Sequence, residues 1–156
     1  MESCTVTSPL GAIKITGDEN GITEVSFLDS EMESTFIPTV LKKCVFQLQQ
    51  YFDGNRKEFD LKLNPKGTEF QKRVWSQLQA IPYGKTTSYL EFSKQLGDAK
   101  AIRAVANANS KNPIGIVIPC HRVIGSDGRL TGYAGGLHRK KWLLEHESQS
   151  KQQSLF

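Results

Sequence analysis

The sequence predicts two small domains: an α/β domain in residues 1–62 and a mainly α domain with a helix-turn-helix in residues 68–147. Short β-rich runs open the chain, and the hydrophobic period becomes helical after the linker expected at 63–67. The net charge also changes sign at this point. The 156 residues have room for two such domains, each with a modest core. A polar segment at 148–156 is expected to be a disordered tail.

The first domain begins with a β-hairpin signal. The runs AIKITGD and ITEVSFLD flank GDENG, a sequence typical of a tight turn. A helix is predicted at 38–52, because apolar residues recur near one face of it: Val40, Leu41, Cys44, Val45, Leu48 and Phe52. Cys44 is therefore expected in the core. The segment DGNRKEFDLKLNPKG then predicts a turn, a further short strand and the linker.

The second domain begins with a helix-start signal. Thr68 and Gln71 match a capping box, in which each side chain bonds the other residue's backbone N–H. An apolar stripe follows and stops at Pro82 and Gly84, which predicts one amphipathic helix before a turn.

Residues 86–109 then outline a helix-turn-helix. Ser88 can cap a helix that reaches Leu96, and Gly97 can make the turn. Asp98 can cap a second helix that ends near Ala108. The outline alone is weak evidence for DNA binding, since many helical hairpins bind nothing.

The charge distribution indicates what such a motif would contact. Residues 1–62 contain 6 Lys and Arg against 10 Asp and Glu, a net charge of −4, whereas residues 63–156 contain 14 against 6, a net charge of +8. Such asymmetry often marks a nucleic-acid surface, although a solvated basic face without a partner gives the same count.

The predicted second helix supports the DNA interpretation. It is rich in alanine, so Arg103 stands between small side chains that allow close approach to a DNA groove or to another helix. An arginine in this place can reach base edges or occupy a gap in the base stack. An ordinary surface arginine is the alternative. The residues of this helix expected to face DNA are Lys100, Ala101, Arg103 and Ala104.

Cysteine usage and the N-terminus point to a cytoplasmic protein, or a nuclear one in a eukaryote. Cys4, Cys44 and Cys120 are too widely spaced for a disulfide framework or a zinc pattern, so no metal is expected. The N-terminus lacks a targeting segment, and no apolar run approaches the roughly 18 residues that a membrane helix needs.

The stretch VIPCHRVIG places Cys120 next to His121 at the end of an apolar run. In an extended strand, neighbouring side chains point to opposite faces, so direct proton transfer between the two is not expected. Without further evidence, a cysteine in such a place is more often an inert core cysteine than a nucleophile.

The segments SYLEFSKQLGDAKAIRAVANAN and NPIGIVIPCHRVIGSDGRLTGYAGGLHRKKWLLEHE closely resemble the O6-alkylguanine-DNA alkyltransferases, also called methylated-DNA-protein-cysteine methyltransferases. The specific match runs from about Phe70 to Glu147. The resemblance implies a ribonuclease-H-like first domain and direct-reversal DNA repair. The alkyl group of O6-alkylguanine in duplex DNA, with O4-alkylthymine as a second candidate substrate, would pass irreversibly to Cys120. Each molecule would act once, as a monomer, without a cofactor or an obligate protein partner.

The resemblance also implies roles for single residues. His121 would reach Cys120 through a water, and Glu147 would hold the far side of the imidazole, as in hydrolase triads. Asn112 would fix the turn before the nucleophile, with Pro119 making the approach rigid. The target nucleotide must leave the stack, because O6 is hidden in a duplex.

In the family's arrangement, Arg103 fills the vacated stack, and Tyr89 pushes the flanking phosphate and donates a hydrogen bond to N3 of the base. The residues expected around the extruded base are Val123, Tyr133, Ala134, Gly135 and Gly136. Some relatives have serine in place of Ala134 and proline in place of Gly115, differences that bear on the width of the pocket.

Three other functions remain open from the sequence. A cysteine hydrolase would also use Cys, His and Glu, but it needs an oxyanion hole for which the sequence gives no specific signal. An alkyltransferase-like lesion sensor would keep the helix-turn-helix but lack the reactive cysteine that this chain has. A transcriptional regulator would need a dimer interface or an effector domain, for which so short a chain has little room.

Overall fold

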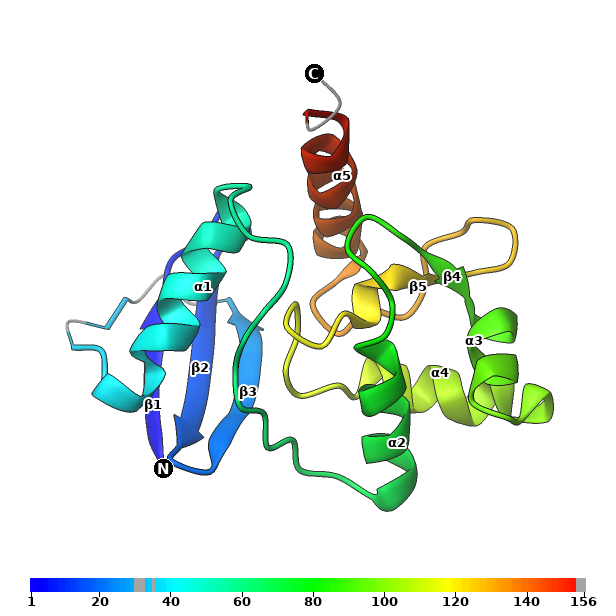
Figure 1. The fold of residues 1–156 in the computed structure, drawn as a ribbon, viewed down its shortest axis with the longest axis horizontal. Coiled ribbons are helices and arrows are strands. Elements are labelled where there is room, and N and C mark those ends of the chain that lie inside the picture. Colours follow the sequence, from blue (N-terminus) through cyan, green and yellow to red (C-terminus); the bar gives the residue numbers. More distant parts are fainter. Residues whose placement is uncertain (30–32, 35, 154–156) are drawn as a thin grey trace. The chain divides into compact units, whose positions relative to one another are not determined.

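The computed structural model describes residues 1–29, 33–34 and 36–153 (Figure 1). The chain forms two compact units. Unit 1 contains Met1–Lys66 and Pro113–Val117, and unit 2 contains Gly67–Asn112 and the chain from Ile118 onward. Each unit combines elements that the sequence predicts with contacts that it does not reveal.

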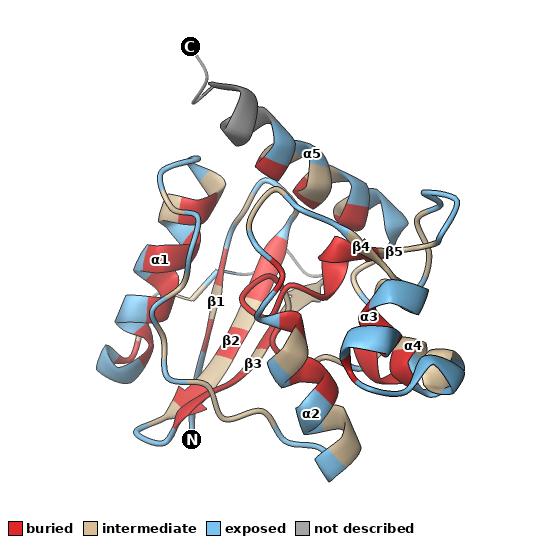
Figure 2. Cartoon of the chain, turned by 45° about the vertical axis from the view of Figure 1, so that its right-hand side comes forward, coloured by how far each residue is buried: buried red, intermediate tan, exposed pale blue. Residues whose placement is uncertain are grey.

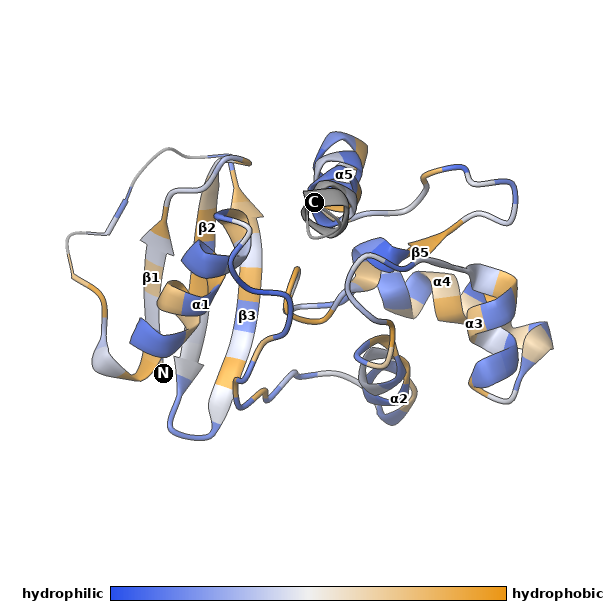
Figure 3. Ribbon diagram, turned by 45° about the horizontal axis from the view of Figure 1, so that its top comes forward, coloured by the Kyte–Doolittle hydropathy of each residue, from blue (hydrophilic) through white to orange (hydrophobic). Residues whose placement is uncertain are grey.

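Unit 1 is built on a three-stranded antiparallel sheet, in which β2 (Ala12–Asp18) lies between β1 (Glu2–Val6) and β3 (Gly21–Leu28). The hairpin of β2 and β3 confirms the turn signal. Figure 3 shows hydrophobic and hydrophilic residues interspersed along these two strands, the pattern of a sheet with one covered face. β1 was not predicted, since its five residues lie at the chain end without a turn signal before them.

One helix covers this sheet. A 3-10 turn, η1 (Thr39–Leu41), leads into α1 (Lys42–Phe52), close to the predicted range. Figure 2 shows the buried residues of α1 on one side of the helix. Cys44 is 1% exposed, as expected for a core residue. Val40, however, is 39% exposed, in the 3-10 turn that precedes the helix.

A short segment from later in the chain completes unit 1, and it corrects the predicted domain boundary. The backbone N–H of Val25 donates to Pro113 O, and that of Gly115 donates to Val25 O, both at 2.9 Å. A parallel bridge joins Val25 and Ile114. Residues 113–117 therefore belong with β3, although the sequence placed them in the second domain. Local pattern could not show this, since the pairing joins residues far apart in the chain.

Unit 2 begins with α2 (Glu69–Leu78), whose N-terminus carries the predicted capping box. The backbone N–H of Gln71 donates to Thr68 Oγ1 at 3.1 Å, and that of Thr68 donates to Gln71 Oε1 at 2.9 Å. A two-stranded parallel ladder, β4 (Thr87–Ser88) with β5 (Val123–Ile124), places the start of the helix-turn-helix beside the segment after Cys120.

The helix-turn-helix is confirmed, with one refinement. Ser88 caps α3 (Tyr89–Gln95), and Asp98 caps a 3-10 turn, η2 (Ala99–Ala101), that leads into α4 (Ile102–Ser110). Gly97 makes the connection at φ +95°, a conformation that residues with a side chain rarely adopt. Figure 1 shows α3 and α4 side by side.

The C-terminal helix α5 (Leu137–Gln153) is longer than predicted. The disordered tail expected from 148 is wrong for residues 148–153, because this polar stretch contains no Pro or Gly and continues the helix with Lys and Gln, which favour helices. Residues 154–156 lie outside the described part of the chain. Within that part, no helix is both long and apolar enough to cross a membrane.

Candidate active site

Cys120 and His121 lie in a buried 3-10 turn, η3 (Cys120–Arg122), that directly follows Pro119. The extended conformation assumed from the sequence is wrong at this point. Proline limits the backbone before the turn, and the N–H of Cys120 bonds Ile118 O at 2.8 Å, which curls the chain. The turn presents three consecutive polar side chains to the interior of unit 2, each 6% exposed or less.

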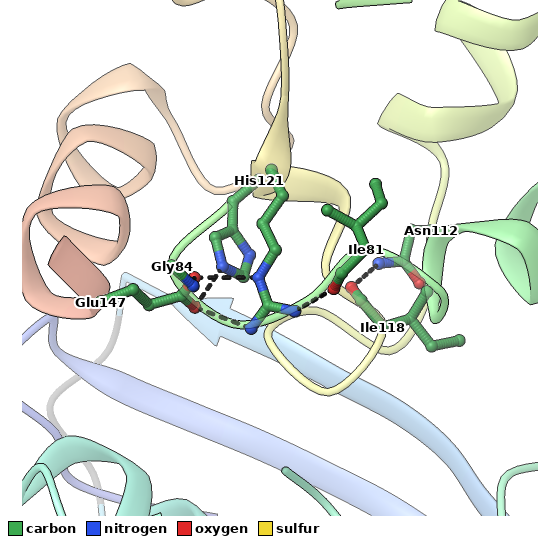
Figure 4. Close-up of polar contacts among 7 residues, drawn as sticks. Ile81, Gly84, Asn112, Ile118, His121 and Glu147 are labelled. Atoms are coloured by element: carbon green, nitrogen blue, oxygen red, sulfur yellow. Dashed lines mark hydrogen bonds and ion pairs between the residues drawn. The ribbon is translucent and has the colours of Figure 1, made fainter. Parts of the chain in front are cut away.

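The thiol of Cys120 is held by the residues around it. Burial raises the pKa of Cys120, while a hydrogen bond from Asn112 and the positive charge of Lys140 oppose that rise. Asn112 also donates through Nδ2 to Ile118 O at 2.8 Å, so it contacts the turn in the place expected of it (Figure 4). Because the thiol stays protonated near neutral pH, it needs a base to become a nucleophile.

His121 and Glu147 form a buried pair beside the cysteine. The distance from His121 Nε2 to Glu147 Oε2 is 2.7 Å, and both side chains are 1% exposed or less (Figure 4). Burial lowers the pKa of His121, partly offset by Glu147, so the imidazole is neutral near pH 7. The neighbouring His121 and Arg122 hold the pKa of Glu147 well below its usual range despite its burial.

These pKa directions fix the hydrogen on the imidazole. An ionised carboxylate only accepts hydrogen bonds, so Nε2 of His121 carries the hydrogen and donates it to Glu147. Nδ1 is then the ring nitrogen with a free lone pair. It is buried, and it has no hydrogen-bond partner among the residues that the structure describes. The imidazole of His121 can therefore act as a base through Nδ1, while Glu147 holds its Nε2–H.

Arg122 is a member of this site that the sequence did not reveal. Its Nε and Nη2 donate to Glu147 Oε1 and Oε2 at 2.9 and 3.1 Å, and Nη1 donates to Ile81 O at 2.7 Å. The backbone N–H of Gly84 approaches Glu147 Oε1 at 3.4 Å. The two hydrogen bonds from the guanidinium of Arg122 orient the carboxylate of Glu147 toward His121. The position of Arg122 beside Cys120 and His121 is the signal that could have identified it.

Two more buried polar side chains adjoin the cysteine, and neither was predicted from the sequence. Asn109, on α4, donates through Nδ2 to Cys120 O at 3.3 Å. Lys140, on α5, donates through Nζ to Val123 O and to Thr131 O, each at 2.7 Å. In sequence, Lys140 lies in the run HRKKW and looks like a surface cation.

Tyr89 and the expected pocket residues lie near the same turn. The Tyr89 hydroxyl donates to Thr131 O at 3.3 Å, and the side chain is partly buried at the start of α3. Val123, just after η3, is fully buried. Tyr133, Ala134, Gly135 and Gly136 form a tight turn, closed by the Gly136 N–H donating to Tyr133 O at 3.0 Å. Gly136 adopts φ +95°, a backbone shape suited to glycine.

The residues expected to face DNA are on the outer side of the helix-turn-helix. Lys100, Arg103 and Ala104 are exposed, and Ala101 is partly exposed. On the opposite side of α4, Val105, Ala108 and Asn109 are buried. The helix therefore presents a cation among small side chains to the outside, as the composition suggested.

No cluster of three or more His, Cys, Asp or Glu side chains that could hold a metal occurs in the described residues. Cys4 and Cys44, the other two thiols, are both buried, and burial raises the pKa of each, that of Cys44 to about 12.

Comparisons with known proteins match both the N-terminal and the C-terminal part of the chain. The family model of the 6-O-methylguanine DNA methyltransferase ribonuclease-like domain matches residues 4–65, and that of the DNA binding domain matches residues 69–149. A methylated-DNA--protein-cysteine methyltransferase from Methanosarcina acetivorans is 48% identical over 146 residues, covering 90% of this chain and 94% of its own.

Solved structures give the same result. The crystal structure of the Mycobacterium tuberculosis O6-methylguanine methyltransferase matches with a TM-score of 0.84 at 45% identity, covering 94% of this chain and 92% of that one. A structure of the same organism's protein in complex with DNA matches with a TM-score of 0.85 at 44% identity and the same coverage. The chain belongs to the 6-O-methylguanine DNA methyltransferase family.

Proposed function

We propose that this protein repairs DNA by direct reversal: it transfers the alkyl group of O6-alkylguanine in duplex DNA to the sulfur of Cys120, once per molecule. The observation that carries the proposal is the buried chain of Cys120, His121 and Glu147, within a family whose curated relatives are named methylated-DNA--protein-cysteine methyltransferases. A compartment without disulfide chemistry, the cytoplasm, fits its three free thiols.

The proposed reaction is a displacement at carbon. The proton of Cys120 passes through a water to Nδ1 of His121, while Glu147 stabilises the imidazolium that forms. The thiolate then attacks the alkyl carbon, a C–S bond forms and the bond from carbon to O6 breaks. The electron pair of the broken bond stays with the guanine, and Tyr89 donates a hydrogen bond to N3 to stabilise that anion.

Duplex DNA is the proposed partner, with the protein acting as a monomer. A related protein has been crystallised in complex with DNA, and the exposed face of α4 carries Arg103 between alanines. A damaged guanine must be rotated out of the stack before its alkyl group can meet a buried sulfur. We propose that Arg103 fills the gap in the stack, with Lys100 contacting the backbone.

The alternatives explain less of the site. A lesion sensor without repair activity would not require a cysteine flanked by a base and an anchored carboxylate. A cysteine hydrolase would need donors for an oxyanion, whereas the buried donors of Arg122 and Lys140 are bound to Glu147 and to backbone carbonyls.

Mass spectrometry tests the proposal. After incubation with a duplex containing O6-methylguanine, the protein should gain the mass of one methylene, and the gain should map to the tryptic peptide NPIGIVIPCHR, whose only cysteine is Cys120. An unmodified protein, or a modification on Cys4 or Cys44, would contradict it.

Arg103→Ala should separate extrusion from chemistry. We expect repair of a duplex lesion to slow about tenfold or more, the effect of losing about 1.4 kcal/mol of stabilisation, while reaction with free O6-benzylguanine stays unchanged. The control is Arg129→Ala, which removes a 75% exposed arginine side chain outside the helix-turn-helix. Equal losses on both substrates would show that Arg103 has another role.

A further inference from the structure

Lys140 is a buried cation with an unusual set of partners. It is 0% exposed, yet it makes no ion pair with a carboxylate in the part of the chain that the structure describes. Lysines are rarely buried in full unless their charge is compensated. Instead, the ammonium donates to two backbone carbonyls, Val123 O and Thr131 O, both at 2.7 Å.

These two carbonyls belong to different parts of the candidate site. Val123 immediately follows the turn that carries Cys120, and Thr131 precedes the glycine-rich turn proposed to line the base pocket. Thr131 O also accepts the hydroxyl of Tyr89, at the longer distance of 3.3 Å. Lys140 Nζ is 5.9 Å from the centre of the Tyr89 ring. The ammonium of Lys140 thus links three parts of the site: the segment that follows Cys120, the pocket segment from Thr131 to Gly136, and Tyr89.

The shared acceptor has a consequence for Tyr89. In the function proposed above, on which this inference rests, the Tyr89 hydroxyl donates to N3 of the base. That hydroxyl has a single hydrogen, so it must leave Thr131 O to do so. A partly buried carbonyl that loses its donor raises the free energy of the complex. The bond from Lys140 keeps Thr131 O satisfied during this change of partner.

We propose that Lys140 is a positioning residue for alkyl transfer: its ammonium ties Val123 O to Thr131 O, which holds the pocket segment in place and frees the Tyr89 hydroxyl to bond the base. Lys140 transfers no proton in this step and touches no substrate atom. Its role is to make the exchange of one hydrogen-bond acceptor for another nearly neutral in energy.

The charge of Lys140 adds a separate effect. Burial lowers the pKa of Lys140 to about 8, although the nearby Cys120 opposes this. The charged and titratable groups around it are Cys120, His121 and Tyr89. Below its pKa the ammonium favours the thiolate of Cys120. Above it, the neutral amine loses this charge but keeps two N–H donors for its two carbonyls, so pH separates the two effects.

A comparison of two small substrates tests the inference. Free O6-benzylguanine is compared with its 3-deaza analogue, in which a carbon replaces N3, so only the first can accept the Tyr89 hydrogen bond. Lys140→Met loses the charge that favours the thiolate and should slow with both substrates. Its reaction with benzylguanine should slow about tenfold more than its reaction with the analogue, as expected for about 1.4 kcal/mol from a lost hydrogen bond. The matched control is Lys141→Met, a neighbour on α5 whose side chain is 69% exposed.

Tyr89→Phe provides the reference for complete loss of the N3 bond. The ratio of the benzylguanine rate to the analogue rate should fall in Lys140→Met toward its value in Tyr89→Phe. The double variant should lower this ratio little further than the single variants do. Equal slowing on both substrates would leave Lys140 with its charge effect or a general structural role alone and overturn the inference, as would behaviour like that of Lys141→Met.

The unaltered protein supplies a second test, which does not depend on the variant folding. As the pH rises through about 8, Lys140 becomes neutral, whereas burial raises the pKa of Tyr89 and keeps its hydroxyl protonated. The ratio of the two rates should stay constant, since both substrates need the same thiolate. A ratio that collapses above the pKa of Lys140 would contradict the role in hydrogen bonding. Failure of the unaltered protein to accept a methyl group from a duplex containing O6-methylguanine would instead contradict the proposed function.

Discussion

Cys120→Ser is expected to abolish alkyl transfer completely while leaving DNA binding intact. The hydroxyl of serine is far less acidic than a thiol, and the neutral imidazole of His121 cannot ionise it near pH 7. The substitution is close in size, so the turn of Cys120–Arg122 should keep its shape. The measurements are the methyl label transferred from a radioactive duplex and the affinity for the same duplex.

The other cysteines give the matched controls. Cys4→Ala and Cys44→Ala remove buried thiols whose raised pKa values keep them protonated, so both variants should accept one label as the parent does. A labelled Cys120→Ser protein, or an unlabelled Cys44→Ala protein that remains folded, would remove Cys120 from its proposed role.

Glu147→Gln should slow transfer about 100-fold near pH 7, at the lower end of the range for loss of general-base assistance. The carboxylate opposes the effect of burial on the pKa of His121, so its loss lowers that pKa further and makes the imidazole a weaker base. The rate should recover partly as pH rises toward the pKa of an unassisted thiol, because Cys120 then ionises without His121.

The control for this variant is Glu145→Gln, on the same helix, with a side chain that is 58% exposed and forms an ion pair with Lys141. Glu147→Gln also leaves Arg122 buried without its counter-charge, a change that costs about 3–5 kcal/mol in comparable pairs. The rates must therefore be compared below the unfolding temperature of the variant. A Glu147→Gln protein as fast as the parent at neutral pH would exclude the carboxylate from the mechanism.

Local signals explain why much of the fold could be predicted from the sequence. The hairpin of β2 and β3, the capping box of Thr68 and Gln71, and the turn at Gly97 all depend on residues within a few positions of one another. The pairing of 113–117 with β3 depends on residues almost 90 positions apart, since Val25 bonds Pro113 and Gly115. No periodicity records such a contact.

The residues of the candidate site likewise divide into those that could be predicted from the sequence and those that could not. The motif around Cys120 led to the family resemblance, and through it to His121, Glu147 and Asn112, which the structure brings together in unit 2. Lys140 was not found, because a buried lysine differs from an exposed one only through its partners. Those partners are backbone carbonyls, which leave no trace in a sequence. Arg122 was missed for a related reason: its partner Glu147 is 25 residues away.

The number of lesions that one chain consumes tests the central claim most directly. A thioether, unlike a thioester, has no activated carbonyl for water to attack, so neither His121 nor Glu147 can release a methyl group bound to Cys120. With an excess of duplex carrying O6-methylguanine, the protein should consume one lesion per active chain and then stop, and repurified protein should remain inactive. Continued consumption of lesions by repurified protein would contradict the assignment of Cys120 as an irreversible acceptor.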